Sequence, residues 1–359
     1  MKLLSIYLTN FRNYSDRVFL CADEGALVLG PNGSGKTNLF EAIAYSSYGK
    51  SFRYQNDDLL ANFGQKSFSI LAEFELKIGK CSIRTDYAFG KKKISINQIP
   101  VRQLSQIYEY VKVIYCSPED IYLVNGSPRK RRQYFDLAIA QLRPSYINQL
   151  RHYLHIMEQR NSLFKDSSNR KQKKHWDTLF IKAALPVIAQ RMEYIELLNS
   201  KIQNTYKNQL AETGSVNLTY VPTLNIPTGN EDSDFKDALK SVESREWQYQ
   251  RSLIGPHLDD YDIVLKSRLL KDIGSQGQKR TVTLLIKIAH LELLKDVIGE
   301  YPILLLDDIF AELDKVHTTS FMNILDSHEQ VFVASPNDFI REYWKNIPVI
   351  ELAEKSEQS

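Results

Sequence analysis

The stretch from residue 26 to residue 43 reads Ala26-Leu27-Val28-Leu29-Gly30-Pro31-Asn32-Gly33-Ser34-Gly35-Lys36-Thr37-Asn38-Leu39-Phe40-Glu41-Ala42-Ile43, and the rest of the chain is organised around it. Its four leading aliphatic residues predict a buried strand, and the segment from Asn38 onward predicts a helix. Between them, residues 30–37 form a GxxxxGK(S/T) loop. Such a loop points several backbone N–H groups at one spot on a helix N-terminus, where they and the helix dipole together hold a polyphosphate. The sequence therefore predicts a phosphate-binding P-loop.

The side chains of this loop predict a site for ATP and Mg²⁺. Lys36 is expected to reach the β and γ phosphates, and the Thr37 hydroxyl is expected to take a magnesium ion. The residues expected to contact the nucleotide are Gly30, Pro31, Asn32, Gly33, Ser34, Gly35, Lys36, Thr37 and Asn38. A glycine-rich turn that spells the motif by chance is the alternative. The flanking strand and helix disfavour it, because the motif requires both.

A second apolar segment, at 302–306, ends in the carboxylate pair Asp307 and Asp308. An aliphatic run of this kind predicts a parallel strand that is buried on both faces. Opposite a P-loop, Asp307 can hold magnesium through water, while Asp308 can orient or deprotonate the attacking water. The pair is a weak signal alone, and the upstream P-loop makes it a strong one. Asp308 and Lys36 are the expected catalytic residues, although the sequence does not separate the two carboxylates in function.

Composition limits the possibilities more broadly. The 359 residues, 43% hydrophobic and 25% charged, suffice for one large or two ordinary globular domains. The formal net charge of +3 is too small to indicate a nucleic-acid partner by itself. Cys21, Cys81 and Cys116 lie far apart without CxxC spacing, which disfavours disulfides and a zinc site and fits a reducing cytosol. No apolar run suggests a signal peptide or a membrane anchor, so we expect a cytoplasmic protein.

The N-terminal third predicts mostly strands. Short strands are expected at 2–8 and 17–20, immediately before the P-loop strand. Between 68 and 99, polar and apolar residues alternate on either side of Gly-Lys turns, which predicts an antiparallel β meander beside the P-loop core. Residues 111–115 predict one more buried strand.

In the middle of the chain, apolar residues recur every three or four positions, which predicts helices. Two long helices separated by the polar loop 166–174 predict an antiparallel helical hairpin. Pro144 is expected to start a new helix, and Pro186 is expected to kink the second long helix. Residues 208–245 predict a connecting loop with one short helix near 235–242.

A polar segment, Ser275-Gln276-Gly277, precedes a strong helical pattern at 281–297, and it resembles the signature loop of ABC-type ATPases. Its chemistry is again a helix N-terminus offered to a phosphate. In that class the signature loop faces the γ-phosphate bound by the other subunit. The resemblance therefore implies a dimer that ATP holds together and hydrolysis releases.

A helical hairpin between the P-loop and the signature loop resembles the plan of SMC-like ATPases, and the chain looks like a member of the RecF family of bacterial recombination mediators. The resemblance runs nearly from end to end. Its blocks are Asn10–Tyr14, Gly30–Asn38, Gly49–Arg53, Ser117–Asp120, Gly126–Pro128, Arg131–Arg132, Phe135–Asp136, Leu253–His257, Ser275–Thr281 and Leu304–Asp314.

The resemblance implies an α/β fold, in which an ABC-type P-loop ATPase head (a mixed sheet with flanking helices and an antiparallel β meander) carries an inserted α-helical hairpin domain. We expect the N-terminal part of the head at 1–125, the helical arm at 126–245, and the C-terminal part of the head at 246–359. The resemblance also implies slow ATP hydrolysis, ATP-dependent dimerisation through Asp314, and binding of double-stranded and gapped DNA in replication, repair and the SOS response. The implied partners are RecR and RecO, and indirectly RecA.

Basic clusters are the candidates for DNA contact, because they neutralise phosphates without reading bases. The candidates are Arg129, Lys130, Lys171, Lys173 and Lys174, with Lys91–Lys93 at a predicted hairpin tip. A solvated surface is the alternative for each cluster. Arg131 and Arg132 open a helix in a motif-like block, and we favour a role as internal braces for them.

Two positions depart from the family pattern. Leu258 stands where an arginine commonly precedes the acidic pair, and Ser335 stands where threonines are usual and transport ATPases carry a switch histidine, so we assign neither a role. The missing histidine and the helical insert disfavour a transporter ATPase subunit. A DNA-tethering SMC-like protein would need a far longer coiled coil, and a small-molecule kinase would not need residues 275–280.

Overall fold

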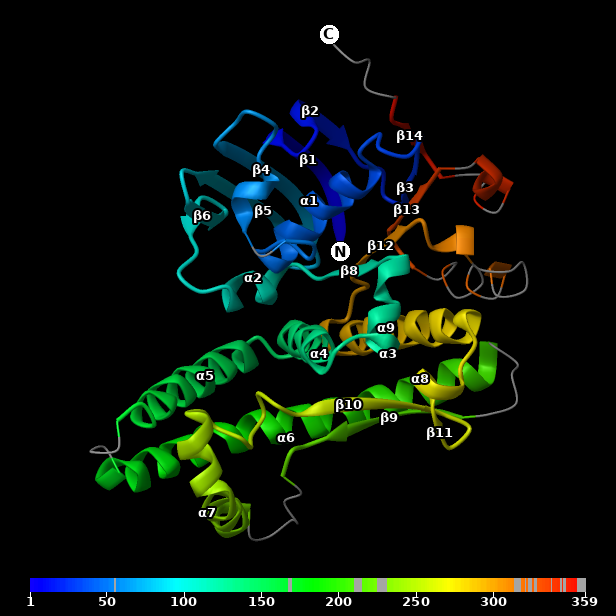
Figure 1. The fold of residues 1–359 in the computed structure, drawn as a ribbon. Coiled ribbons are helices and arrows are strands. Elements are labelled where there is room, and N and C mark those ends of the chain that lie inside the picture. The colour runs from blue at the N-terminus through cyan, green and yellow to red at the C-terminus, as the bar shows by residue number, and fades with distance from the viewer. Residues whose placement is uncertain are drawn as a thin grey trace. The chain divides into compact units, whose positions relative to one another are not determined.

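The computed structural model describes the chain except residues 55, 167–169, 210–214, 225–230, 313–317, 320, 322–324, 326–327, 337, 343, 345–346 and 354–359 (Figure 1). The chain divides into two compact units. The first consists mainly of Met1–Asp120 and Ser275–Ser359, and the second mainly of Ile121–Asn204 and Thr213–Gly274. In the described part of the chain, no helix combines the length and the apolar character needed to cross a membrane.

A five-stranded parallel sheet forms the centre of the first unit. Its strands, in spatial order, are β14 (Val349–Glu351), β3 (Gly25–Leu29), β13 (Val331–Ser335), β12 (Ile303–Asp307) and β8 (Val113–Cys116). The four strands β3, β13, β12 and β8 are buried along their whole length, as parallel strands covered on both faces should be. The expected buried strands are confirmed, and the P-loop and the aspartate pair follow strands of the same sheet.

The expected antiparallel meander is also confirmed. Its sheet has the order β2-β1-β4-β5-β6-β7. The bounds are β1 Lys2–Phe11, β2 Tyr14–Leu20, β4 Ser67–Leu76, β5 Gly79–Ala88, β6 Lys91–Ile96 and β7 Ile99–Pro100. Buried and less buried residues alternate along β4 and β5, because one face of the sheet packs against the core.

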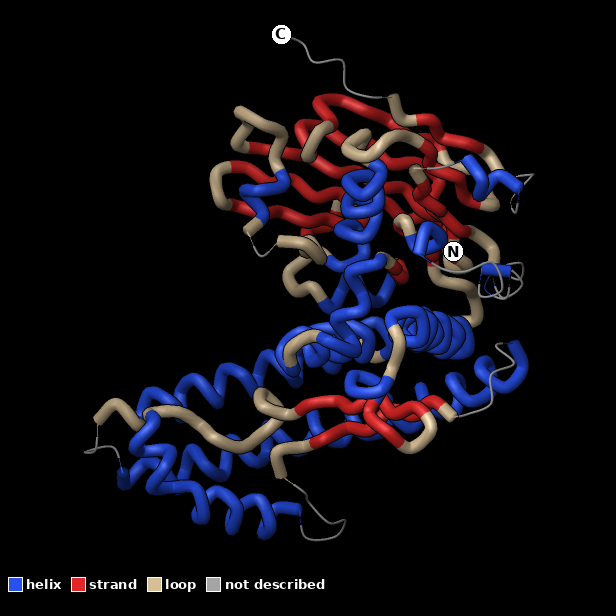
Figure 2. The backbone as a smooth tube through the Cα atoms, turned by 45° about the vertical axis from the view of Figure 1, so that its right-hand side comes forward, coloured by secondary structure: helices blue, strands red, loops and turns tan. Residues whose placement is uncertain are grey.

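Helix α1 (Lys36–Tyr48) lies between these two sheets (Figure 2). It contacts β8, β12 and β13 of the parallel sheet and β1, β4 and β5 of the meander. Almost every residue of α1 is therefore buried, which an amphipathic surface helix would not show. The helix that carries the P-loop lysine is fixed on both sides. Helix α9 (Gln276–Ile298) packs against β8, and the short α2 (Ser105–Tyr110) contacts α1.

The second unit is mostly helical. Its helices are α3 (Tyr122–Asn125), α4 (Pro128–Leu142), α5 (Ser145–Leu163), α6 (Arg170–Gln209), α7 (Glu231–Tyr249) and α8 (Leu270–Ile273). The predicted helical hairpin is confirmed as α5 and α6, which contact each other through the rings of Tyr153 and Phe180. Pro144 precedes α5 as expected, and α6 continues through Pro186 as one element of 40 residues.

The prediction for residues 208–245 was wrong in two respects. A strand, β9 (Val216–Val221), pairs with β10 (Asp260–Leu265), which in turn pairs with β11 (Arg268–Leu269). Burial alternates along β9, so its period-two pattern was the missed signal. Helix α7 is also longer than expected, because only Phe235, Leu239 and Glu246 are buried in it and its polar remainder hides the period. Residues 246–274, expected in the head, lie in the second unit.

A buried ion pair ties three helices of the second unit together. Arg160 of α5 is completely buried, and its guanidinium binds both carboxylate oxygens of Glu246 in α7, at 2.9 and 2.5 Å. Its Nε also donates to Asp177 of α6 at 2.8 Å. A paired and fully hydrogen-bonded charge is tolerated in a core, whereas one that has lost its partner is costly.

We expect Arg160→Met to lower the free energy of unfolding by about 3–5 kcal/mol, because Glu246 would remain as a buried carboxylate without its counter-charge. Urea denaturation followed by circular dichroism measures this change. Lys240→Ala is the control, since Lys240 pairs with Asp237 where both side chains are about three-quarters exposed (76% and 74%). It should change stability by less than about 0.5 kcal/mol. Equal effects of the two variants would contradict the prediction.

Candidate phosphate-binding site

The backbone of the P-loop surrounds the side chain of Lys36. Lys36 is the first residue of α1, and its buried ammonium donates to the backbone carbonyls of Gly30, at 2.8 Å, and Pro31, at 3.1 Å. The loop can close in this way because Gly33 and Gly35 have positive φ angles of 85° and 111°, which residues with a Cβ rarely adopt. The ammonium is thereby held where a phosphate at the N-terminus of α1 would meet it.

The turn between β1 and β2 braces this loop. Asn13 donates through Nδ2 to the carbonyl of Ser34 at 3.1 Å and accepts at Oδ1 from Asn38 at 2.9 Å. The Tyr14 hydroxyl donates to the carbonyl of Gly35 at 3.1 Å. No role was predicted for this turn from the sequence. Its side chains fix the loop from outside the motif.

A buried carboxylate on α1 anchors the same turn. Glu41 is fully buried and receives two hydrogen bonds from the Arg12 guanidinium, at 2.8 and 3.0 Å. The Ser51 hydroxyl donates to the same carboxylate at 2.5 Å. The Arg12 guanidinium also lies over the Tyr54 ring, 4.3 Å from its centre, and Arg53 approaches Glu41 to 3.9 Å. Neither the Arg12 nor the Glu41 role was predicted, because nothing in their spacing shows that they meet.

The predicted carboxylates lie across the sheet from the loop. Asp307 ends β12, and β13 is the single strand between β12 and β3. Burial raises the pKa of Asp307, while hydrogen bonds from Tyr115 and Thr37 and the charge of Lys36 lower it. Burial likewise raises the pKa of Asp308, and Lys36 again lowers it. The structure thus brings Lys36, Thr37 and the two aspartates together.

Three polar atoms at this site lack partners in the described part of the chain. They are Ser34 Oγ, Asp307 Oδ1 and Asp308 Oδ1, all buried without a hydrogen bond. An unsatisfied buried polar atom costs about 1–3 kcal/mol, so native structures keep few of them. Asp308 also has a φ of 51°, a strained conformation for a residue other than glycine. A phosphate with its cation and water would supply the missing partners, so the residues fit that group.

The oxygen atoms at this site suit a magnesium ion that is bound mainly by substrate phosphates and water. Within the described residues, no group of three or more His, Cys, Asp or Glu side chains could hold a metal ion. Magnesium normally keeps several waters and binds through one or two protein oxygens together with substrate phosphates. Thr37 and Asp307 would provide such oxygens.

The signature segment forms the N-terminus of α9. Ser275 caps the helix, since its hydroxyl accepts from the Gln278 N–H at 3.2 Å while Gln278 Oε1 accepts from the Ser275 N–H at 3.0 Å. Ser275, Gln276 and Gly277 are exposed. Within the described part of the chain, no hydrogen bond or ion pair joins them to the P-loop. Asp314 lies outside the described residues.

The basic candidates fall into different environments. Arg129 and Lys130 are exposed in the first turn of α4, and Lys171 and Lys174 are exposed on α6. Lys173 is buried instead, and its ammonium pairs with Asp177 at 2.6 Å. The expected DNA contact of Lys173 therefore finds no support, because an ammonium held in a buried pair does not reach a phosphate in solution.

The preferred interpretation of Arg131 and Arg132 as internal braces is confirmed. Arg131 is buried and forms two hydrogen bonds of 2.7 Å with the Asp260 carboxylate, and Arg132 donates to the carbonyl of Asp259 at 2.6 Å. Arg131 links α4 to the first residue of β10, and Arg132 links α4 to the residue before that strand.

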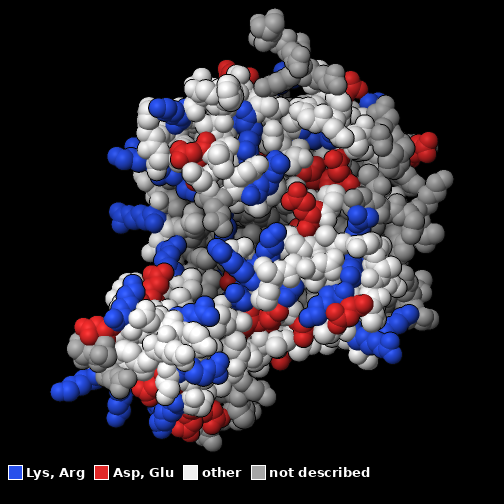
Figure 3. All heavy atoms as spheres, in the orientation of Figure 1, with Lys and Arg blue, Asp and Glu red and all other residues white. Residues whose placement is uncertain are grey.

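Basic side chains also project from the edge of the first unit that carries β6, where Lys91–Lys93 are exposed (Figure 3). Leu258 is 41% exposed, and Ser335 is buried at the end of β13.

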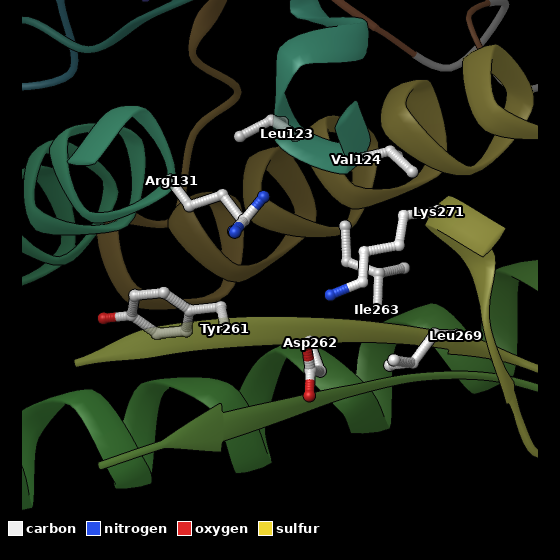
Figure 4. A pocket seen from close by; sticks show the side chains of 8 residues that line it. All are labelled: Leu123, Val124, Arg131, Tyr261, Asp262, Ile263, Leu269 and Lys271. Carbon is white, nitrogen blue, oxygen red and sulfur yellow. The ribbon is translucent and has the colours of Figure 1, made fainter. Parts of the chain in front are cut away.

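One small cavity lies in the second unit, and the side chains of Arg131 and Lys271 extend into it (Figure 4). Its volume of about 10 Å³ is near the minimum for a single water molecule. Its lining residues are Leu123, Val124, Arg131, Tyr261, Asp262, Ile263, Leu269 and Lys271. The cavity is too small for a nucleotide or another organic ligand.

Comparisons with known proteins identify the family of the chain. The family described as the RecF/RecN/SMC N terminal domain matches residues 2–356. A DNA replication and repair protein RecF from Acetivibrio thermocellus is 33% identical over 318 residues, which cover 86% of each chain. The protein of the same name from Ruminiclostridium cellulolyticum is 32% identical over 359 residues, covering 97% of this chain and 95% of that one. A solved structure described as the recombination mediator protein RecF-ATP in the RecFOR pathway superposes with a TM-score of 0.87 at 26% identity, covering 94% of this chain and 92% of the other.

We expect Gly35→Ala to destabilise the protein by about 1–3 kcal/mol more than Gly33→Ala, as measured by urea denaturation. Both substitutions force a Cβ onto a positive φ. At Gly35 the new atom would also lie 2.5 Å from Asn13 Nδ2 and 2.8 Å from the Tyr14 hydroxyl, whereas at Gly33 no atom lies within 4 Å. Equal losses in the free energy of unfolding would contradict the prediction, because the contacts of Asn13 and Tyr14 with the loop would then not contribute to stability.

Proposed function

The chain belongs to the RecF/RecN/SMC N-terminal domain family, and within it to the RecF proteins, and from this we propose that it is an ATP-dependent DNA-binding protein of recombinational repair and replication. The observation that carries the proposal is the set of buried, unpartnered oxygens beside Lys36, on Ser34, Asp307 and Asp308. They lie where a magnesium-bound triphosphate would satisfy them. A similar protein is described with ATP, which supports the same ligand here.

The residues of the site have separate roles in this proposal. Lys36 would transfer its hydrogen bonds from the two loop carbonyls to the β and γ phosphate oxygens. Thr37 and Asp307 would hold magnesium, which when bound neutralises the phosphate charge. Asp308 would orient the attacking water or take its proton. Burial raises the pKa of Asp308, and a carboxylate with a raised pKa accepts a proton more readily than an ordinary carboxylate does.

A second copy of the chain completes the site in this proposal. Ser275, Gln276 and Gly277 present the exposed N-terminus of a 23-residue helix, which favours an anion. A γ-phosphate bound on one copy would meet the signature segment of the other, so ATP would join two copies and slow hydrolysis would separate them. Nucleotide shifts this equilibrium only because it binds the dimer more tightly than the monomer.

The DNA and protein partners follow from the family. We propose that Arg129, Lys130, Lys171 and Lys174 contact DNA phosphates of double-stranded and gapped DNA. RecR and RecO are the proposed protein partners, and loading of RecA is the proposed result, since a similar structure is described as part of the RecFOR pathway. Cytoplasm is the proposed compartment, and the free thiols of Cys21, Cys81 and Cys116 suit its reducing conditions.

Analytical ultracentrifugation with ATP and gapped DNA tests this proposal. We expect the wild type to dimerise with ATP and Lys36→Ala to stay monomeric, because the alanine variant lacks the phosphate-binding ammonium. Asp308→Asn should accumulate as a DNA-bound dimer, because it keeps the binding site but hydrolyses ATP at least about a hundredfold more slowly.

Lys77→Ala is the matched control, because it removes an exposed lysine of the same unit outside the loop. It should dimerise like the wild type. A wild-type protein that stays monomeric with ATP and ignores DNA would refute the role given to the signature segment.

A further inference from the structure

The Asp307 carboxylate has a partner outside every motif of the chain. Tyr115 lies on β8, next to β12 in the parallel sheet. Its hydroxyl donates to Asp307 Oδ2 at 2.8 Å, and both side chains are buried. A phenol is protonated at neutral pH, so the hydroxyl is a permanent donor to this oxygen.

The Tyr115 side chain is itself held in place. The Phe52 ring stacks on it with 3.9 Å between ring centres and an angle of 23° between the planes. Its backbone carbonyl accepts from Lys287 Nζ at 2.6 Å, and Lys287 forms a buried ion pair with Asp120 at the end of the same segment. With the ring packed and the backbone tied, the hydroxyl has little freedom to leave Asp307.

The two oxygens of Asp307 are therefore in different situations. Oδ2 is occupied by Tyr115, whereas Oδ1 is buried without a hydrogen-bond partner in the described part of the chain. The Thr37 side chain lies near the same carboxylate and lowers its pKa. A carboxylate fixed at one oxygen presents the other in one orientation, which is how an outer-shell partner prepares a metal ligand.

We propose that Tyr115 is a positioning residue for the divalent cation. Its hydroxyl fixes Asp307 so that Oδ1 is presented to magnesium together with the Thr37 hydroxyl. This inference rests on the proposed function, which gives Asp307 its role as a magnesium-holding carboxylate.

Tyr115→Phe tests the inference, because it removes the hydroxyl and keeps the ring that stacks on Phe52. We expect the magnesium concentration at half-maximal binding of a fluorescent ATP analogue to rise about tenfold or more, since loss of an outer-shell partner typically weakens metal binding 10- to 100-fold. The affinity for the same analogue in EDTA should stay unchanged. The rise in melting temperature caused by Mg-ATP should become smaller, while the rise caused by ATP in EDTA should not. A purely structural role would reduce binding in both conditions.

Tyr48→Phe is the matched control. Its hydroxyl is also buried and donates to the carbonyl of Val113 on β8 at 2.9 Å, away from Asp307. It should keep the wild-type magnesium midpoint. If Tyr115→Phe folds and has the same midpoint as the wild type and Tyr48→Phe, the inference is wrong.

Two further variants keep the outcomes separate. Phe52→Leu removes the stacking ring but not the hydroxyl, so it should raise the magnesium midpoint in the same direction by less. If Tyr115→Phe does not fold, an unchanged midpoint in Phe52→Leu overturns the inference. Lys36→Ala reports on the proposed function itself: if it binds the analogue as well as the wild type, or if wild-type binding ignores magnesium, the proposed function fails whatever Tyr115 does.

Discussion

The parallel pairing of β3, β13, β12 and β8 is the constraint on which the site depends. In a parallel sheet the carboxyl ends of all strands meet at one edge, so the loop after β3, the two aspartates at the end of β12 and Tyr115 on β8 come together. The register pairs Ala334 of β13 with Asp307 on one side and with Val28 on the other. Since β3 and β12 lie about 275 residues apart in the chain, the site exists only when both ends of the chain have joined the same sheet.

Three charged side chains, those of Lys36, Asp307 and Asp308, lie at this edge of the sheet, although burial disfavours charged groups. Among the residues that the structure describes, the buried Lys36 ammonium has only backbone carbonyls as hydrogen-bond acceptors, and the two aspartates near its charge are partly removed from water. Asp308 adds a strained backbone conformation to its unpartnered oxygen. These features reduce stability without a ligand, and strain and unpaired polar atoms typically gather at binding sites because the ligand relieves them. The close packing of α1 between two sheets compensates for them.

The sequence predicted those parts of the structure that local pattern determines. The P-loop requires fixed backbone geometry at fixed spacing, and the meander and β12 show their periods directly, so all three were found. The contact between Arg12 and Glu41 and the contact between Tyr115 and Asp307 were not predicted. Tyr115 and Asp307 lie 192 positions apart, so no local pattern shows that they meet. Lys173 appeared to be one lysine of a basic run, and the structure shows that it is buried and paired with Asp177 one helical turn later on α6. The strand β9 was missed for a different reason, since its alternation was present but its polar surroundings suggested a loop.

One helix connects the two halves of the proposed site within a single chain. Helix α9 begins at the signature segment, and twelve positions beyond Ser275 its Lys287 holds the carbonyl of Tyr115, whose hydroxyl holds Asp307. Lys287 also pairs with Asp120, so α9 contacts both β8 and the turn that follows it. Energetic coupling between sites is carried by packed side chains and hydrogen bonds that move together, and this series of contacts is both short and buried. In the proposed dimer, a phosphate that displaced the N-terminus of α9 would therefore act on the Asp307 carboxylate through Lys287 and Tyr115.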